Sequence, residues 1–119
     1  MLPAVFASLL LLAAAPQQAP SPALDAETMN DVRCLVATTS IVKNKDPKLA
    51  QAGMIASQYF LGRIDGRTPK LDLEDALVRA AKSISQEQMK ALFQRCGTLL
   101  HDRGEAVKAI GARLEARGI

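Results

Sequence analysis

The chain has 119 residues and a formal net charge of +3, with 15 Lys and Arg against 12 Asp and Glu. Hydrophobic residues make up 49% of it but aromatic residues only 3%, so a core must be built from aliphatic side chains and alanine. Charges of both signs are interspersed, and the densest basic cluster, Lys43, Lys45 and Lys48, contains no aromatic residue. This pattern argues against a nucleic-acid partner.

Residues 1–23 have the pattern of a secretory signal peptide and a short remnant. The apolar run 4–15 is too short to cross a bilayer as a helix, although the usual basic residues before it are missing. Small residues allow cleavage after Ala15 or after Ala23. We expect residues 24–119 to form one exported domain without a membrane span, in the periplasm or outside the cell.

The first helix is predicted over residues 26–43, with Asp25 as its N-cap. Its apolar residues cover two sides, which indicates a helix enclosed by its neighbours. The β-branched residues within 36–42 lower helix propensity, so a strand is the competing interpretation there.

A second helix is predicted to begin with Asp46 as N-cap and Pro47 in the first turn, and to end at Asp65-Gly66. Its apolar residues recur at spacings of three and four. Within that stripe, Gly53 and Ala56 would let another helix approach closely.

The third and fourth helices carry clear start signals, Asp72 for the third and a Ser85–Gln88 capping box for the fourth. One face of the fourth helix is apolar and is predicted to be buried in the core: Met89, Leu92, Phe93, Cys96, Leu99 and Leu100. Gly104 is expected to break the chain before a last helix over 105–117, with one long helix as the alternative. The predicted fold is therefore all-α, a small bundle of four or five helices.

Cys34 and Cys96 are the only two cysteines, and in an exported chain they are expected to form one disulfide. Closing so long a loop would stabilise the fold by roughly 4 kcal/mol. A redox-active thiol is the alternative, but neither cysteine belongs to a CxxC motif. A structural disulfide is the favoured interpretation.

A candidate binding site lies in the string 59–67, which brings Tyr59 and Phe60 close to Arg63 and Arg67. The arginines could clamp a carboxylate or phosphate group while the rings form the floor of a groove. The competing interpretation places the rings in the core and the arginines at a solvated helix end.

The sequence offers no catalytic, metal or cofactor site. The single histidine, His101, has no serine-elbow motif to work with. Helix capping accounts for Asp72 and Asp75. Because the cysteines are assigned to the disulfide, too few metal ligands remain. We expect no enzyme.

The arrangement of the chain resembles the HdeA-type family of small periplasmic acid-stress chaperones. The shared features are a leader, an all-helical domain, and two cysteines, Cys34 and Cys96, that join an early helix to a late one. The resemblance implies a homodimer that loosens at low pH and exposes apolar surface to clients. The string 56–66 is also similar to a segment of small periplasmic immunity proteins of the Rap1a/Tai type.

Two functions follow as hypotheses. The first is a non-enzymatic exported binding or chaperone-like protein, whose apolar helical faces hold a protein partner or client. The alternative is an inhibitor or immunity-type protein that blocks a secreted enzyme with the turn around Arg63 and Arg67.

Overall fold

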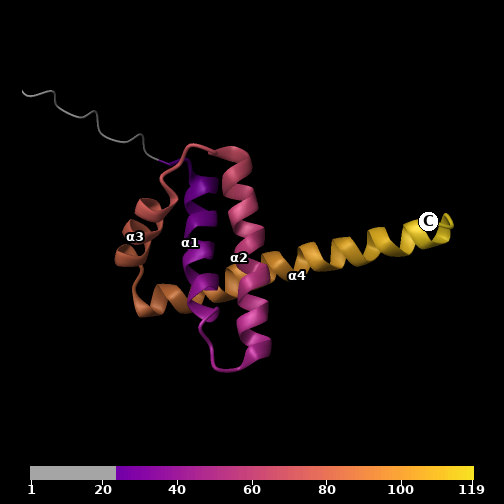
Figure 1. The fold of residues 1–119 in the computed structure, drawn as a ribbon, viewed down its shortest axis with the longest axis horizontal. Coiled ribbons are helices and arrows are strands. Elements are labelled where there is room, and N and C mark those ends of the chain that lie inside the picture. The colour runs from indigo at the N-terminus through magenta and orange to yellow at the C-terminus, as the bar shows by residue number, and fades with distance from the viewer. Residues whose placement is uncertain (1–23) are drawn as a thin grey trace, which may run out of the picture.

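The computed structural model describes residues 24–119, which form four helices and no strand (Figure 1). The helices are α1 (Ala26–Ile41), α2 (Pro47–Arg67), α3 (Leu73–Ser83) and α4 (Gln86–Ala116). The predicted all-α class is confirmed, and the predicted leader lies outside the described residues. None of these four helices combines the length and the apolar character that a membrane span requires.

Helix α1 is the centre of the fold, because each of the other three helices packs against it (Figure 1). It buries residues on more than one side, including Val32, Cys34, Leu35 and Ala37. The prediction of an enclosed helix is thereby confirmed. The strand alternative is wrong, because burial on several sides outweighs the weak helix propensity of the β-branched residues. The helix ends at Ile41, slightly earlier than the predicted Lys43.

Helix α2 packs tightly against α1 at Gly53, the close approach that its sequence predicted. A Cβ atom at Gly53 would lie 2.9 Å from the Cβ of Ile41 and 3.1 Å from the carbonyl oxygen of Thr38, so only glycine fits without a shift. Nearby, the Ser57 hydroxyl donates a hydrogen bond to Oγ1 of Thr38 at 3.0 Å. The interface between α1 and α2 therefore joins tight backbone packing to buried polar contacts.

The predicted helix starts are confirmed. Asp25, Asp46, Asp72 and Ser85 are the N-caps of the four helices, and Ser85 forms the complete capping box with Gln88. The predicted end of α2 at Gly66 is early, because the helix runs on to Arg67. It stops where Pro69 disfavours the helical conformation of the residue before it.

Helix α4 is continuous through Gly104, so the predicted break at that residue is wrong, the alternative of one long helix is confirmed, and the described residues form four helices. A single interior glycine costs only about 1 kcal/mol relative to alanine, which is too little to end a long helix. On the predicted apolar face, Leu92 and Cys96 are buried, whereas Phe93 is 39% exposed. Phe93 is not among the residues that pack against the core, which corrects its predicted place there.

The disulfide between Cys34 and Cys96 is confirmed, with Cα atoms 5.7 Å apart. It ties α1 to α4 across 62 residues of chain, for which loop-closure entropy gives about 4 kcal/mol of stabilisation. Such a bond is consistent with an oxidising compartment. No disulfide links helix α2 to another helix, so beyond the connecting loop 42–46 only non-covalent contacts hold α2 against α1.

Candidate functional site

The four residues predicted as a binding site lie in the last turns of α2, but they do not form an open groove. Phe60 is fully buried in the core. Tyr59 is half-buried and meets the Phe60 ring edge-on, with centroids 5.2 Å apart. The phenylalanine is therefore a core residue, as the structural interpretation of this string held.

Arg63 and Arg67 both point to a buried carboxylate on α1, that of Asp31. The Nε of Arg63 donates to Oδ2 of Asp31 at 2.9 Å, and Nη2 of Arg67 donates to the same oxygen. The Asp31 side chain is only 4% exposed. We call these three residues the Asp31 cluster; it fixes the C-terminal half of α2 against α1.

Neighbouring polar groups support the cluster. Nη1 of Arg63 donates to the Tyr59 hydroxyl at 3.4 Å, and the guanidinium carbon lies 5.7 Å from the centre of that ring. The hydrogen bond to Asp31, followed in importance by the one to Tyr59, raises the pKa of Arg63, while partial burial opposes this. Among the described residues, every buried side-chain nitrogen and oxygen has a hydrogen-bond partner.

The start of α1 adds a second electrostatic feature beside the cluster. Asp25 accepts hydrogen bonds from both the backbone N–H and the hydroxyl of Thr28, each at 2.8 Å. These bonds lower the pKa of Asp25 below its usual 3.8. The Thr28 hydroxyl also lies 3.5 Å from Nε of Arg67, so the cap and the Asp31 cluster are adjacent.

The sequence prediction did not include Asp31. Its signal was present, because Asp31 stands among the apolar residues Val32 and Leu35 of α1, and Arg63 and Arg67 lie one helical turn apart on α2. The buried carboxylate is fully compensated by two guanidinium groups, and Glu27, whose Oε2 lies 3.9 Å from Nη1 of Arg67, offsets the remaining positive charge from the surface. An external anion at Arg63 and Arg67 would therefore have to compete with Asp31.

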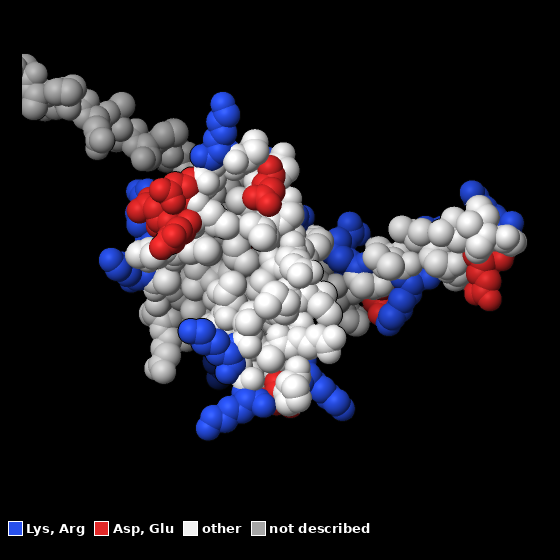
Figure 2. Space-filling view, in the orientation of Figure 1, with Lys and Arg blue, Asp and Glu red and all other residues white. Residues whose placement is uncertain are grey.

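The solvent side of α2 is unusual for its lack of charge. No Asp, Glu, Lys or Arg occurs in residues 49–62, and the view in Figure 2 shows an uncharged surface over α2. Ile55 is 61% exposed and Met54 is 47% exposed. We define the α2 outer face by its exposed residues Gln51, Ala52, Met54, Ile55 and Gln58. A surface helix of a small protein normally carries charged residues on this side.

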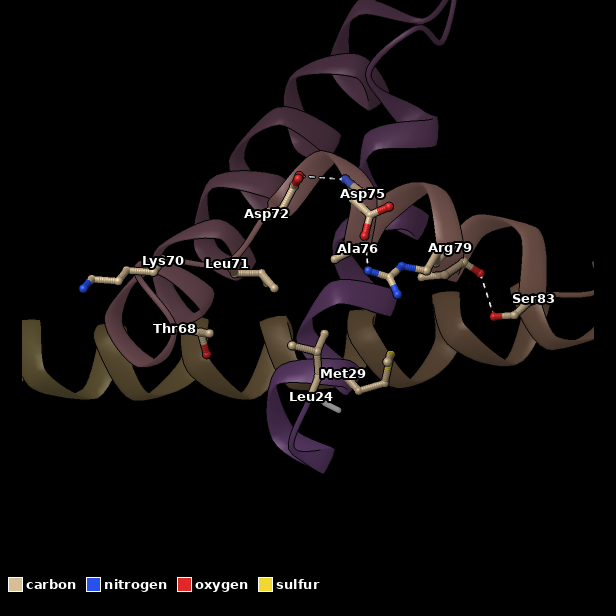
Figure 3. A pocket seen from close by; sticks show the side chains of 11 residues that line it. Leu24, Met29, Thr68, Lys70, Leu71, Asp72, Asp75, Ala76, Arg79 and Ser83 are labelled. Carbon is tan, nitrogen blue, oxygen red and sulfur yellow. Dashed lines mark hydrogen bonds and ion pairs between the residues drawn. The ribbon is translucent and has the colours of Figure 1, made fainter. Parts of the chain in front are cut away.

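A hollow of about 670 Å³ lies between the start of α1, the loop 68–72 and α3 (Figure 3). Leu24, Met29, Leu71 and two alanines of α3 provide its apolar wall. An ion pair between Asp75 and Arg79 lies along its edge. The hollow contains none of the predicted site residues, and no sequence pattern could have revealed it, because three separate elements form it.

The remaining chemistry of the described residues is sparse. No group of three or more His, Cys, Asp or Glu side chains in residues 24–119 is arranged to hold a metal ion. His101 lies exposed on α4.

The sequence matches no protein-family model, no curated protein and no solved structure. A functional interpretation must therefore come from the surfaces and contacts described above.

Proposed function

We propose that this chain is a non-enzymatic exported binding protein of the chaperone type, which holds a protein client on the α2 outer face. The observation that carries the proposal is the exposure of Met54 and Ile55 on a helix without a charged residue over positions 49–62. Contiguous apolar surface on a small protein marks a site of protein association. An uncharged surface with exposed apolar side chains favours apolar segments of many sequences over one specific ligand.

The predicted compartment is the periplasm or the outside of the cell. The leader-like residues 1–23 and the bond between Cys34 and Cys96 both support export to an oxidising environment. A disulfide-stabilised domain can also remain compact under conditions that loosen its other contacts.

The arrangement also supports a response to acid, as the resemblance to the HdeA-type family implies. Protonating the 12 carboxylates and His101 would take the net charge from +3 to about +16, which repels the helices from one another. The disulfide holds α4 to α1 but does not hold α2, so α2 is the helix expected to loosen, which would expose buried Phe60 beside the α2 outer face.

The inhibitor hypothesis receives less support. It assigns Arg63 and Arg67 to a partner enzyme, whereas both donate to Asp31 within the fold. Their side chains are 35% and 29% exposed, so a partner would reach only part of each guanidinium group.

The proposal is tested by the aggregation of an unrelated client at neutral pH and at about pH 3, in the presence of the oxidised protein. We expect suppression that is stronger in acid. The variant Ile55→Lys should lose it, because lysine stays charged at both pH values. The matched control is Val78→Lys on α3, where the wild-type residue is 46% exposed and lies off the α2 outer face. Unchanged client aggregation in excess wild-type protein would contradict the proposal.

A further inference from the structure

The second half of α4 extends away from the body as a free helix (Figure 1). We call residues 101–119 the α4 extension; all of them are exposed except the half-buried Ala106. A lone helix of this length is marginal in water, and Gly104 and Gly111 weaken it further. The extension is therefore expected to need a surface that covers it.

The α4 extension carries an apolar stripe of its own. Val107, Ile110 and Leu114 are 67%, 47% and 39% exposed, and at 100 degrees per residue they lie within about 60 degrees of arc. The stripe continues the face on which Leu92 and Cys96 are buried by the body. The same side of one helix is thus covered in its first half and bare in its second.

Three glycines of α4 line one edge of this stripe at intervals of seven residues: Gly97, Gly104 and Gly111. A Cβ atom at Gly104 or Gly111 would meet open space, so nothing within the fold requires glycine there. Glycines on a helix surface allow the backbone of another helix to come close. The repeat matches a helix that runs alongside the extension.

We propose that the α4 extension is a self-association surface, on which two copies of this chain pack antiparallel about a two-fold axis level with Gly111 and Ala112. Residues 108 and 115 are equally far from this axis, so Lys108 of each copy lies level with Glu115 of the other. Both side chains are on the flank of the helix next to the glycine edge, where the absence of intervening side chains lets them meet. Within its own helix Lys108 pairs with Glu105 at 2.7 Å, but these two side chains are 76% and 52% exposed, so that pair contributes little and does not keep Lys108 from the second copy. The pair occurs twice by symmetry.

Two further features favour this arrangement over a parallel one. In a parallel pair about a two-fold axis along the helices, the glycine edges of the two copies would lie on opposite sides of the seam, so Lys108 of one copy could not pair with Glu115 of the other. In the antiparallel pair, Arg103 lies just past the last turn of the other helix, where exposed carbonyl groups favour a cation. The two bodies also stand at opposite ends and do not collide.

The contact is small. The helical part of the extension, residues 101–116, is about 24 Å long at 1.5 Å per residue, and such a seam buries less than the roughly 1,200 Å² of the smaller specific interfaces. The dimer should therefore be weak and concentration-dependent. It is independent of client binding, which we assign to the α2 outer face.

The charge arrangement is tested by sedimentation equilibrium of the oxidised protein over a wide concentration range at neutral pH and low salt. We expect the mass to rise from that of one chain towards that of two. Lys108→Glu or Glu115→Lys alone should raise the dimer dissociation constant about tenfold, and the double exchange should restore it to within about threefold. A monomer at every concentration, or no restoration in the double variant, would overturn the proposal.

The glycine edge is tested by Gly111→Gln, with Ala112→Gln as the matched control. Both positions are exposed and adjacent in sequence, but Ala112 lies on the far side of the helix from the stripe. Glutamine favours helix more than glycine does, so Gly111→Gln should raise helical content while weakening the dimer. Equal dissociation constants for the two variants would refute the seam. Client suppression measured on the same samples separates a failure here from a failure of the proposed function.

Discussion

Replacing Asp31 by Asn tests how firmly the Asp31 cluster attaches α2 to α1. The Asp31 side chain is 4% exposed, and its Oδ2 accepts hydrogen bonds from Arg63 and Arg67. Asparagine keeps the size of the side chain but removes its charge. The two guanidinium groups would then face a neutral amide in a largely buried contact.

The size of the expected loss in stability follows from how exposed the two arginine side chains are. Removing one member of a fully buried ion pair costs about 3 to 5 kcal/mol. Here the arginine side chains are 35% and 29% exposed, so water can solvate them in part. We therefore expect Asp31→Asn to lower the free energy of unfolding by about 2 kcal/mol, the range of a hydrogen bond to a charged group.

The assay is urea unfolding of the oxidised protein at neutral pH, followed by far-UV circular dichroism. Asp75→Asn is the matched control, because Asp75 also pairs with an arginine, Arg79, but the two side chains are 46% and 66% exposed. An exposed pair contributes little, so this change should cost no more than about 0.5 kcal/mol. Equal losses for the two variants would refute the argument that burial gives the Asp31 cluster its importance.

Three other predictions concern stability. Reduction of the disulfide between Cys34 and Cys96 should lower the free energy of unfolding by about 4 kcal/mol, and two freely titrating thiols in the native oxidised protein would contradict the bond. Leu92→Ala should lower the free energy of unfolding by about 2 to 5 kcal/mol, because Leu92 is only 6% exposed. Phe93 is 39% exposed, so Phe93→Ala should lower it by only about 1 kcal/mol, and equal losses in urea unfolding would contradict this difference. Because folding lowers the pKa of Asp25 from 3.8, its cap stabilises the fold above that value, and this contribution disappears as the pH falls through the folded-state pKa. Asp25→Asn should thus flatten the decline of the thermal midpoint in acid, and a decline as steep as that of the wild type would count against the cap.

Sequence reasoning succeeded where local chemistry decides the structure. Each N-cap depends on a side chain and a backbone N–H two or three residues away, so Asp25, Asp46, Asp72 and Ser85 could be recognised directly. Gly53 was recognisable because a glycine on an apolar helical stripe lets the backbone of a second helix approach closely. The disulfide followed from there being only two cysteines and one way to pair them.

The sequence predictions failed where the structure depends on contacts between elements that are far apart in the chain. The burial of Asp31 depends on two arginines of another helix, which no window along α1 contains. Phe93 was placed in the core because the apolar face of α4 is continuous, whereas the body covers only part of that face. The break predicted at Gly104 gave the weak propensity of glycine more weight than the strong helix formers around it.

The central claim, that a client is held on the α2 outer face, is tested most directly by photo-crosslinking at about pH 3. A photoreactive residue is placed at position 55, on that face, or at position 78, on α3, and each oxidised protein is mixed with an unfolded client. We expect the client to be crosslinked strongly from position 55 and weakly from position 78, since Ile55 is 61% exposed on an uncharged face. Equal crosslinking from both positions, or none from position 55, would contradict the account.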